Sequence, residues 1–323
     1  MTNNEKRTRL LAIASSLLVM VLATSLCFPQ TDTSKKPKVE TNAKTDFAVG
    51  RSPDAILFDG TNIWVANGLS DTVMKLSTND GTNLGTFPVG SRPAALAYDG
   101  DNIWVANRFS NNVMKLRATD GTLLDTIKVG RHPQALLFDG SSVWVANSEE
   151  GTVTKLRPND GANCTFIVGT RPVAMAFDGS SIWVLNNNSS NVTKLRIDDG
   201  TNLGSFSVGR EPTGIAFDGA NIWVTNFYSR SVTRLNMDGS SRDKIAVEDG
   251  PSSVVFIGGH IVVTNYGSRS ISLIEPQTGK VVRTLGVGRS PAGITFDGAH
   301  IWVANGGSNS VSKVRGSSPS STP

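Results

Sequence analysis

The sequence predicts an all-β protein, a seven-bladed β-propeller of four-stranded antiparallel blades whose ring is closed by an N-terminal strand completing the last blade. Three observations predict this fold. The chain repeats itself every 39 or 40 residues, each repeat contains short strand patterns, and the two ends of the repeat region complete one another. Glycine (32 of 323 residues), serine, threonine and asparagine are abundant, a composition that favours strands and tight turns.

The repeat is clearest in the tryptophans, which are spaced 40, 40, 39, 40 and 79 residues apart, with Val262 at the missing position inside the last interval. An aromatic residue stands six positions before this site in all seven units, and an asparagine three positions after it. The tryptophans are Trp64, Trp104, Trp144, Trp183, Trp223 and Trp302. The asparagines are Asn67, Asn107, Asn147, Asn186, Asn226, Asn265 and Asn305. A period of this length, sustained over residues 47–315, indicates a repeat architecture.

Four strands are expected in each unit. In the second unit they are "AALAY" (94–98), "NIWVAN" (102–107), "NVMKL" (112–116) and "LLDTIKVG" (123–130). Asp-Gly dipeptides follow the first and third of these segments, and Asp-Gly between short β-rich runs is typical of hairpin turns. Seven such units are the pattern of a propeller, because a linear stack would need capping repeats at its ends.

The ends of the repeat region support ring closure. The seventh unit has three strand patterns and then ends in "GSSPSSTP", while "TDFAVG" (45–50) matches the fourth-strand segment "DTIKVG" (125–130). We therefore expect the first strand of the chain to complete the last blade, which leaves no free sheet edge. The expected propeller spans residues 46–315, followed by a disordered tail at 316–323.

Several repeated residues have structural explanations. Each first strand carries a small residue, as expected where seven innermost strands crowd around a central channel, and the Trp and Phe positions should pack one blade on the next. The repeated asparagine is expected to bond to its own turn. The small residues are Ala55, Ala95, Ala135, Ala174, Gly214, Ser253 and Gly293.

The N-terminus has the pattern of an export signal, since three basic residues precede an uncharged apolar stretch at 10–28. Residues 1–28 are thus predicted to be a signal peptide or a membrane anchor; Cys27 adds a lipoprotein as a third alternative. All three place the rest of the chain outside the cytoplasm, in the periplasm or secreted. Residues 29–45 are expected to be a flexible linker. With Cys27 in the apolar run and Cys164 as the other cysteine, no disulfide framework or cysteine-based zinc site is expected.

The blade topology predicts two different rims. The Asp-Gly turns fall on one, and the blade-to-blade connections and second-to-third-strand loops fall on the other. Arginines recur in the connections, and further arginines and aromatic residues occur in the loops. The connection arginines are Arg51, Arg92, Arg131, Arg171, Arg210 and Arg289. The loop residues are Arg108, Phe109, Phe227, Tyr228, Arg230, Tyr266 and Arg269.

Two interpretations fit these arginines. In the first, the arginines only solvate a loop that was copied when the repeat was duplicated, and nearby acids reduce their net positive charge. In the second, they form an arginine-lined surface that holds an anionic ligand. The acids are Glu149, Glu150, Glu248 and Asp249. With aromatics interleaved, such a surface suits a protein, a polysaccharide or a single-stranded nucleic acid. The net charge of +4 is too low for a dedicated duplex-DNA binder. We expect a monomer without a cofactor, touching a membrane only through the N-terminal segment.

The repeat "VGxxPxxIxFDGxxIWVANxxSxxVxKLxxxDG" resembles the YVTN-type β-propeller repeat, with Trp where that family often has Tyr. The resemblance implies the propeller fold and an exported protein without an assigned reaction, and some such proteins are thought to bind macromolecules. More distantly, the repeats are similar to those of NHL and streptogramin-lyase propellers. That likeness implies the alternative function, a metal-dependent lyase or lactone hydrolase working with His and Glu near the channel.

Few residues in the sequence support such a catalytic site. His132 falls among the arginines, and His260 and His300 fall on Asp-Gly turns, where turn residues explain them. No His–Glu cluster, nucleophile elbow or phosphate-cradling loop is evident. We therefore favour a non-enzymatic binding or scaffold protein and predict no catalytic or metal-binding residue.

Overall fold

The computed structural model describes residues 44–157 and 163–315. The chain divides into a unit of residues 1–36 and a unit of residues 37–323, and the description below concerns the second. The predicted signal or anchor, all but the last two residues of the predicted linker, and the predicted tail lie outside the described residues. Within the described ranges, no helix is both long and apolar enough to cross a membrane.

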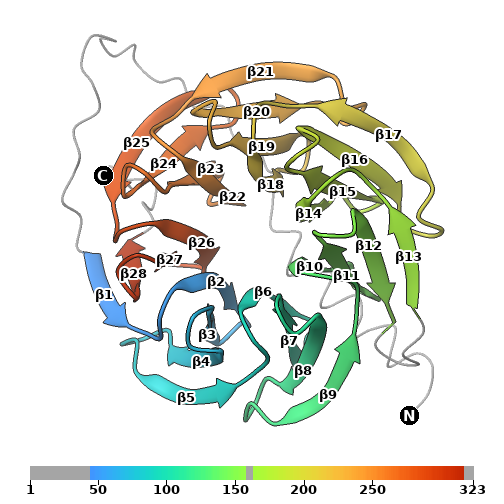
Figure 1. Cartoon of the computed structure of the whole chain (residues 1–323). Helices are drawn as coiled ribbons and strands as arrows, with labels where there is room; N and C mark the ends of the chain where they lie inside the picture. Colours follow the sequence, from blue (N-terminus) through green and yellow to red (C-terminus); the bar gives the residue numbers. More distant parts are fainter. Residues whose placement is uncertain (1–43, 158–162, 316–323) are drawn as a thin grey trace, which may run out of the picture. The chain divides into compact units, whose positions relative to one another are not determined.

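The described residues form twenty-eight strands in seven four-stranded antiparallel sheets, as predicted (Figure 1). Blade 1 contains β2 (Pro53–Phe58), β3 (Asn62–Asn67), β4 (Thr72–Ser77) and β5 (Asn83–Pro88). Blade 2 contains β6 (Pro93–Tyr98), β7 (Asn102–Asn107), β8 (Asn112–Arg117) and β9 (Leu123–Lys128). Blade 3 contains β10 (Pro133–Phe138), β11 (Val143–Asn147), β12 (Thr152–Leu156) and β13 (Asn163–Ile167).

The remaining blades repeat this order. Blade 4 contains β14 (Pro172–Phe177), β15 (Ser181–Asn186), β16 (Asn191–Arg196) and β17 (Asn202–Ser207). Blade 5 contains β18 (Pro212–Phe217), β19 (Ile222–Asn226), β20 (Ser231–Leu235) and β21 (Ser241–Ala246). Blade 6 contains β22 (Pro251–Ile257), β23 (His260–Asn265), β24 (Ser270–Glu275) and β25 (Lys280–Gly286). Blade 7 contains β26 (Pro291–Phe296), β27 (His300–Asn305), β28 (Ser310–Arg315) and β1 (Lys44–Ala48).

The seven blades form a closed ring. The innermost strand of each blade contacts the innermost strand of the next, and the series ends with β26 against β2. Strand β1 pairs antiparallel with β28, with Phe47 opposite Val311, so the N-terminal strand completes the last blade as predicted (Figure 1). Pairing begins at Lys44, which gives the blade two residues that the sequence pattern assigned to the linker.

The innermost strands surround a central cavity of about 330 Å³. Three residues of each blade line it, among them all seven small residues predicted for this place. At Gly214 and Gly293 the next blade is so close that an added Cβ would lie 2.9 Å from Ser253 Cα and 3.0 Å from Ile56 N, respectively. The crowding of the inner strands therefore explains the small residues.

The core lies between the blades rather than in one place. Because side chains alternate across a strand, Ile63 and Val65 of β3 pack against blade 7, whereas Trp64 and Ala66 pack against blade 2. All six tryptophans are at most 1% exposed. Each is thus a major contributor to one blade-to-blade interface, as predicted.

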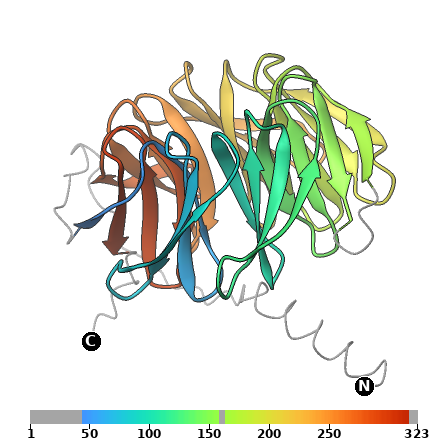
Figure 2. The ribbon, with the colours of Figure 1, turned by 60° about the horizontal axis from the view of Figure 1, so that its bottom comes forward.

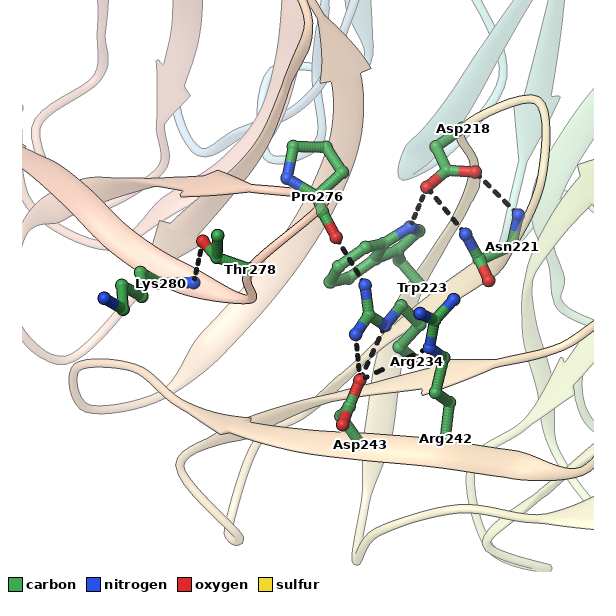
Figure 3. Close-up of polar contacts among 9 residues, drawn as sticks. All are labelled: Asp218, Asn221, Trp223, Arg234, Arg242, Asp243, Pro276, Thr278 and Lys280. Atoms are coloured by element: carbon green, nitrogen blue, oxygen red, sulfur yellow. Dashed lines mark hydrogen bonds and ion pairs between the residues drawn. The ribbon is translucent and has the colours of Figure 1, made fainter. Parts of the chain in front are cut away.

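The Asp-Gly turn between the first two strands does more than reverse the chain. Asp218 accepts hydrogen bonds from the turn amides of Ala220 and Asn221, and its second oxygen accepts the indole N–H of Trp223 at 2.7 Å (Figure 3). The same indole bond, 2.7–2.8 Å long, occurs in every blade that has a tryptophan. The carboxylate therefore ties the turn to the blade interface.

A cation from the third strand covers each of these indoles. Lys194 Nζ lies 4.6 Å from the ring of Trp183 and 3.7 Å from the carboxylate of Asp178, and it donates to the carbonyl of Met237 in the next blade. In blade 5 the cation is Arg234, which bonds the Pro276 carbonyl of blade 6 (Figure 3). The Asp–Trp–cation unit thus fastens neighbouring blades at this rim.

Blade 6 lacks all three members of the unit. Ile257, Val262 and Leu273 occupy the aspartate, tryptophan and cation positions, and all three pack in one apolar cluster. A buried indole N–H or ammonium without its acceptor would be costly, so the three positions change together.

The repeated asparagine bonds across its own hairpin, as predicted. In all seven blades its side-chain amide donates to the residue five positions later, as from Asn107 to Asn112 at 2.9 Å. The glycine of the "VG" segment packs against this asparagine; a Cβ on Gly169 would lie 2.7 Å from Asn186 Cγ. Where the segment has its glycine, the asparagine side chain therefore leaves room only for glycine at the position that packs against it.

Candidate binding face

The rim opposite the Asp-Gly turns is built from two loops per blade, which hydrogen-bond to one another. The amide after each repeated asparagine donates to the carbonyl of the residue before the proline, as from Arg108 to Arg92 at 3.0 Å and from Asn187 to Arg171 at 2.9 Å. All thirteen candidate residues lie on these loops, a surface that we call the arginine face. Figure 2 shows the blades from the side, with loops at both ends of the strands.

The six connection arginines occupy two different positions and do not form one uniform ring. Arg51, Arg131, Arg210 and Arg289 take the first position after glycine and are exposed. Arg92 and Arg171 take the second position, next to the proline, with φ angles of 57° and 58°. Ser52, His132, Glu211 and Ser290 share that left-handed conformation, so it belongs to the blade connection in general and not to a ligand site.

Several arginines already have partners. Arg131 lies 3.7 Å from Glu149 and 3.5 Å from Glu150, and Arg230 lies 2.9 Å from Asp249. The predicted dilution of charge by acids is therefore real for these two. Arg51 donates to the carbonyl of Leu69 at 2.9 Å, which leaves its charge unneutralised.

Three arginines gather near the channel. Arg92 pairs with Asp54 at 3.1 Å, and both side chains are about three-quarters buried. Arg108 is half-buried and acts electrostatically on Arg92, Arg171 and Asp54. Gly68 makes the packing possible, because a Cβ there would lie 2.3 Å from Asp54 Oδ2 and 3.1 Å from Arg92 Nε. Two guanidinium groups, those of Arg92 and Arg108, thus act on one carboxylate, and Arg171 adds a third positive charge beside Arg108.

The charge imbalance is visible in the ionisation of this cluster. Burial lowers the pKa of Arg108 below its usual range, and the positive charges of Arg171 and Arg92 lower it further. Burial raises the pKa of Asp54, although Arg92, Ser52 and Arg108 oppose this. Arg108 Nε is buried without a hydrogen-bond partner among the described residues. An anion would relieve both the missing bond and the repulsion.

Aromatic side chains occupy another part of the same face. The ring of Phe227 lies 5.4 Å from that of Tyr228 and 6.1 Å from that of Tyr266, and the two tyrosines are 63% and 45% exposed. Phe109, 57% exposed, lies 5.7 Å from the Arg108 guanidinium and 5.5 Å from the ring of His132. Exposed aromatic faces of this kind can stack on planar or sugar rings.

The remaining candidates stand apart from this arrangement. Arg210, Arg269 and Arg289 are exposed on their separate loops. His260 and His300 belong to the opposite rim, where they bond the carbonyl of Gly258 and approach Asp297, respectively, as turn residues do. In the described ranges no group of three or more His, Cys, Asp or Glu side chains is arranged to hold a metal ion.

Two residues of the site were missed from the sequence, Asp54 and Asn187. Asn187 accepts a hydrogen bond from Arg171 at 3.2 Å and donates to the carbonyl of Pro212 at 2.8 Å, which fixes the arginine. A signal for Asp54 exists, since it is the one charged residue at its repeat position. The equivalents are Ala94, Gln134, Val173, Thr213, Ser252 and Ala292.

The fold is similar to solved propellers that have different activities. No protein-family model and no curated protein sequence matches the chain. Virginiamycin B lyase from Staphylococcus aureus aligns with a TM-score of 0.75 at 15% identity over 85% of this chain and 99% of its own. A streptogramin B lyase aligns at 0.73 with 16% identity over 84% and 97%, and Kuenenia stuttgartiensis hydrazine synthase at 0.74 with 16% identity over 89% and 99%. The likeness confirms the distant similarity to streptogramin-lyase propellers as a fold and leaves the YVTN resemblance without a matching family model.

Proposed function

We propose that this chain is a binding protein that works outside the cytoplasm and that its arginine face recognises an acidic polysaccharide. The observation that carries the proposal is the excess of positive charge at the channel, where Arg92 and Arg108 act on one carboxylate, that of Asp54, and Arg171 adds a third positive charge beside Arg108. Guanidinium groups match carboxylates in shape and charge.

A polysaccharide fits this face better than a single-stranded nucleic acid. The export pattern at the N-terminus supports a location outside the cytoplasm, where acidic sugars are abundant and nucleic acids are not the expected partners. The exposed aromatics, Phe109, Tyr228 and Tyr266, offer flat surfaces to sugar rings while the arginines hold the carboxylates.

The test is binding of polygalacturonate by the full chain, measured by calorimetry at low and moderate salt, with neutral dextran and oligo(dT) as comparison polymers. Replacing Arg92 and Arg171 together with glutamate should weaken polygalacturonate binding roughly tenfold or more at low salt, since two charge-assisted contacts are lost. The effect should shrink as salt screens the face.

The matched control is the double change Arg117→Glu and Arg196→Glu. These two arginines pair with Asp120 and Asp199 near the Asp-Gly turns, so the net charge changes equally but on the opposite rim. The control should bind like the wild type. Equal loss in both double variants, or tighter binding of oligo(dT) than of polygalacturonate, would overturn the proposal.

The second candidate is a lyase, which the folds of virginiamycin B lyase and streptogramin B lyase suggest. This candidate predicts cleavage of virginiamycin B when a divalent cation is added, and chromatography of the products would detect it. Turnover that survives the Arg92 and Arg171 changes would favour the lyase over the binding function.

A further inference from the structure

The position directly after the repeated asparagine places one residue of each blade beside the channel. Its members differ strongly from blade to blade. In order they are Gly68, Arg108, Ser148, Asn187, Phe227, Tyr266 and Gly306. The amide of each bonds to the connection that leads into the first strand of its blade, so all seven occupy equivalent places around one mouth.

These residues divide the mouth into three sectors, of which the one from blades 7 and 1 carries only the glycines Gly306 and Gly68. Blades 2–4 supply the cationic and polar sector, with Arg108, Asn187 and the Arg171 that Asn187 holds. Blades 5 and 6 supply the aromatic sector, Phe227 and Tyr266. Because the ring has seven members, blades 5 and 6 lie across from blade 2 (Figure 1). The mouth therefore offers charge on one side and flat apolar rings on the other.

A glycine leaves room for the aromatic sector. A Cβ on Gly250 would lie 3.1–3.2 Å from the ring of Phe227, and Gly250 has a φ of 65°, a conformation that suits glycine. Blade 6 has Gly250 where Arg92 and Arg171 stand in their own connections. The same repeat position thus supplies a guanidinium in one sector and room for an aromatic ring in the other.

The size and the polar side chains of the channel below the mouth also suit a sugar ligand. Its volume of about 330 Å³ is at the small end of the range for ligand pockets, which begins at roughly 300 Å³. Asp54 is the one charged residue among those that line it, and Gln134 is the one side-chain amide. Both side chains can bind hydroxyl groups, since a carboxylate accepts hydrogen bonds and an amide both donates and accepts them.

We propose that the channel mouth is an end-binding subsite for the polysaccharide. The carboxylate of a terminal sugar acid binds Arg108 and Arg171, and a neighbouring sugar ring of the same chain stacks on Phe227 and Tyr266. Asp54 remains paired with Arg92 and accepts a sugar hydroxyl. This inference rests on the proposed function and specifies which part of the polymer the mouth takes.

Calorimetry with digalacturonic acid tests the subsite, with galactobiose as its uncharged counterpart. Digalacturonate should bind at least about tenfold more tightly than galactobiose, because only its carboxylate can satisfy the guanidinium groups. Arg108→Gln and Arg171→Gln should each weaken digalacturonate binding about tenfold. Phe227→Leu and Tyr266→Leu should weaken digalacturonate and galactobiose by similar factors, since stacking does not depend on charge.

The control is Arg196→Gln, an exposed arginine that pairs with Asp199 on the opposite rim, which should bind digalacturonate within about twofold of wild type. Arg171 is exposed, so its replacement is compatible with folding even where that of half-buried Arg108 is not. Equal affinity for both disaccharides, or equal losses in the Arg171 and Arg196 variants, overturns the subsite. Polygalacturonate binding without digalacturonate binding refutes the subsite alone, while loss of both refutes the proposed function as well.

Discussion

Replacing Trp183 with phenylalanine removes one hydrogen-bond donor from the centre of the Asp–Trp–cation unit of blade 4. The indole is fully buried, and its N–H donates to Asp178 Oδ2 at 2.7 Å, while the Asp178 side chain has no exposed surface. A hydrogen bond to a charged group contributes about 1.5–3 kcal/mol. The smaller ring leaves unfilled space worth about 1 kcal/mol more. We therefore expect a loss of about 2.5–4 kcal/mol in the free energy of unfolding.

The assay is a double-mutant cycle with Asp178→Asn, using urea denaturation followed by far-UV circular dichroism at neutral pH. If the bond couples the two residues, the double variant should be more stable than the sum of the single losses predicts, by about 1.5–3 kcal/mol. Asp199→Asn, at an exposed turn without an indole partner, should cost much less stability than Asp178→Asn. A coupling energy below about 0.5 kcal/mol would mean that the indole and the carboxylate do not stabilise each other, because independent sites scatter by that much.

Three further predictions concern the fold. Gly169→Ala should cost more than about 2 kcal/mol, because its Cβ would collide with Asn186, whereas Gly286→Ala, which meets nothing within 4 Å, should be nearly neutral in the same urea assay. Deleting residues 44–48 should expose the edge of β28 and produce concentration-dependent aggregation in light scattering, and scattering unchanged from that of the wild type would argue against ring closure by β1. Four turn aspartates have a lowered pKa: burial acts to raise it, but hydrogen bonds from indole and amide donors favour the charged carboxylate and outweigh burial. The stability that these carboxylates contribute should therefore be complete above about pH 4 and should fall as the pH drops below that value. A urea midpoint that does not change in acid would contradict this. The four are Asp99, Asp139, Asp178 and Asp297.

The fold was predictable because its determinants are local and repeated. The tryptophan spacing sets the number of blades, the Asp-Gly dipeptides mark the turns, and the match between residues 45–50 and 125–130 identifies the closing strand. The observed pairing of Phe47 with Val311 follows directly from that match. The predicted start of the propeller differed by two residues from the observed start of β1, because the sequence around this strand end is polar and has no hydrophobic pattern that marks the boundary.

The Asp–Trp–cation unit was only half predicted. The aspartates were correctly placed in turns, but their second oxygen serves the indole, and the third-strand lysines were not assigned a role. The signal was present in the repeats, since blade 6 replaces the aspartate, tryptophan and lysine positions together, by Ile257, Val262 and Leu273. Residues that change as a group within one chain mark a physical contact.

The candidate site was predictable as a face but not as a cluster. The repeat topology placed all thirteen residues on one rim, but from their spacing alone the connection arginines were expected to lie in equivalent positions. Their side chains diverge because Arg92 and Arg171 stand one position nearer the proline, and because Gly68 leaves room for Arg92 to reach Asp54 in the preceding blade. Such contacts between blades depend on ring geometry, which no local pattern contains.

The most direct test of ligand recognition by the arginine face is NMR of the arginine Nε–Hε groups during titration with polygalacturonate. We expect the resonances of Arg108 and Arg171 to shift, because their guanidinium groups take up the carboxylates. The resonances of Arg117 and Arg196, at the opposite rim, should stay in place. Shifts confined to Arg117 and Arg196, or no shifts at a saturating concentration of polymer, would contradict it.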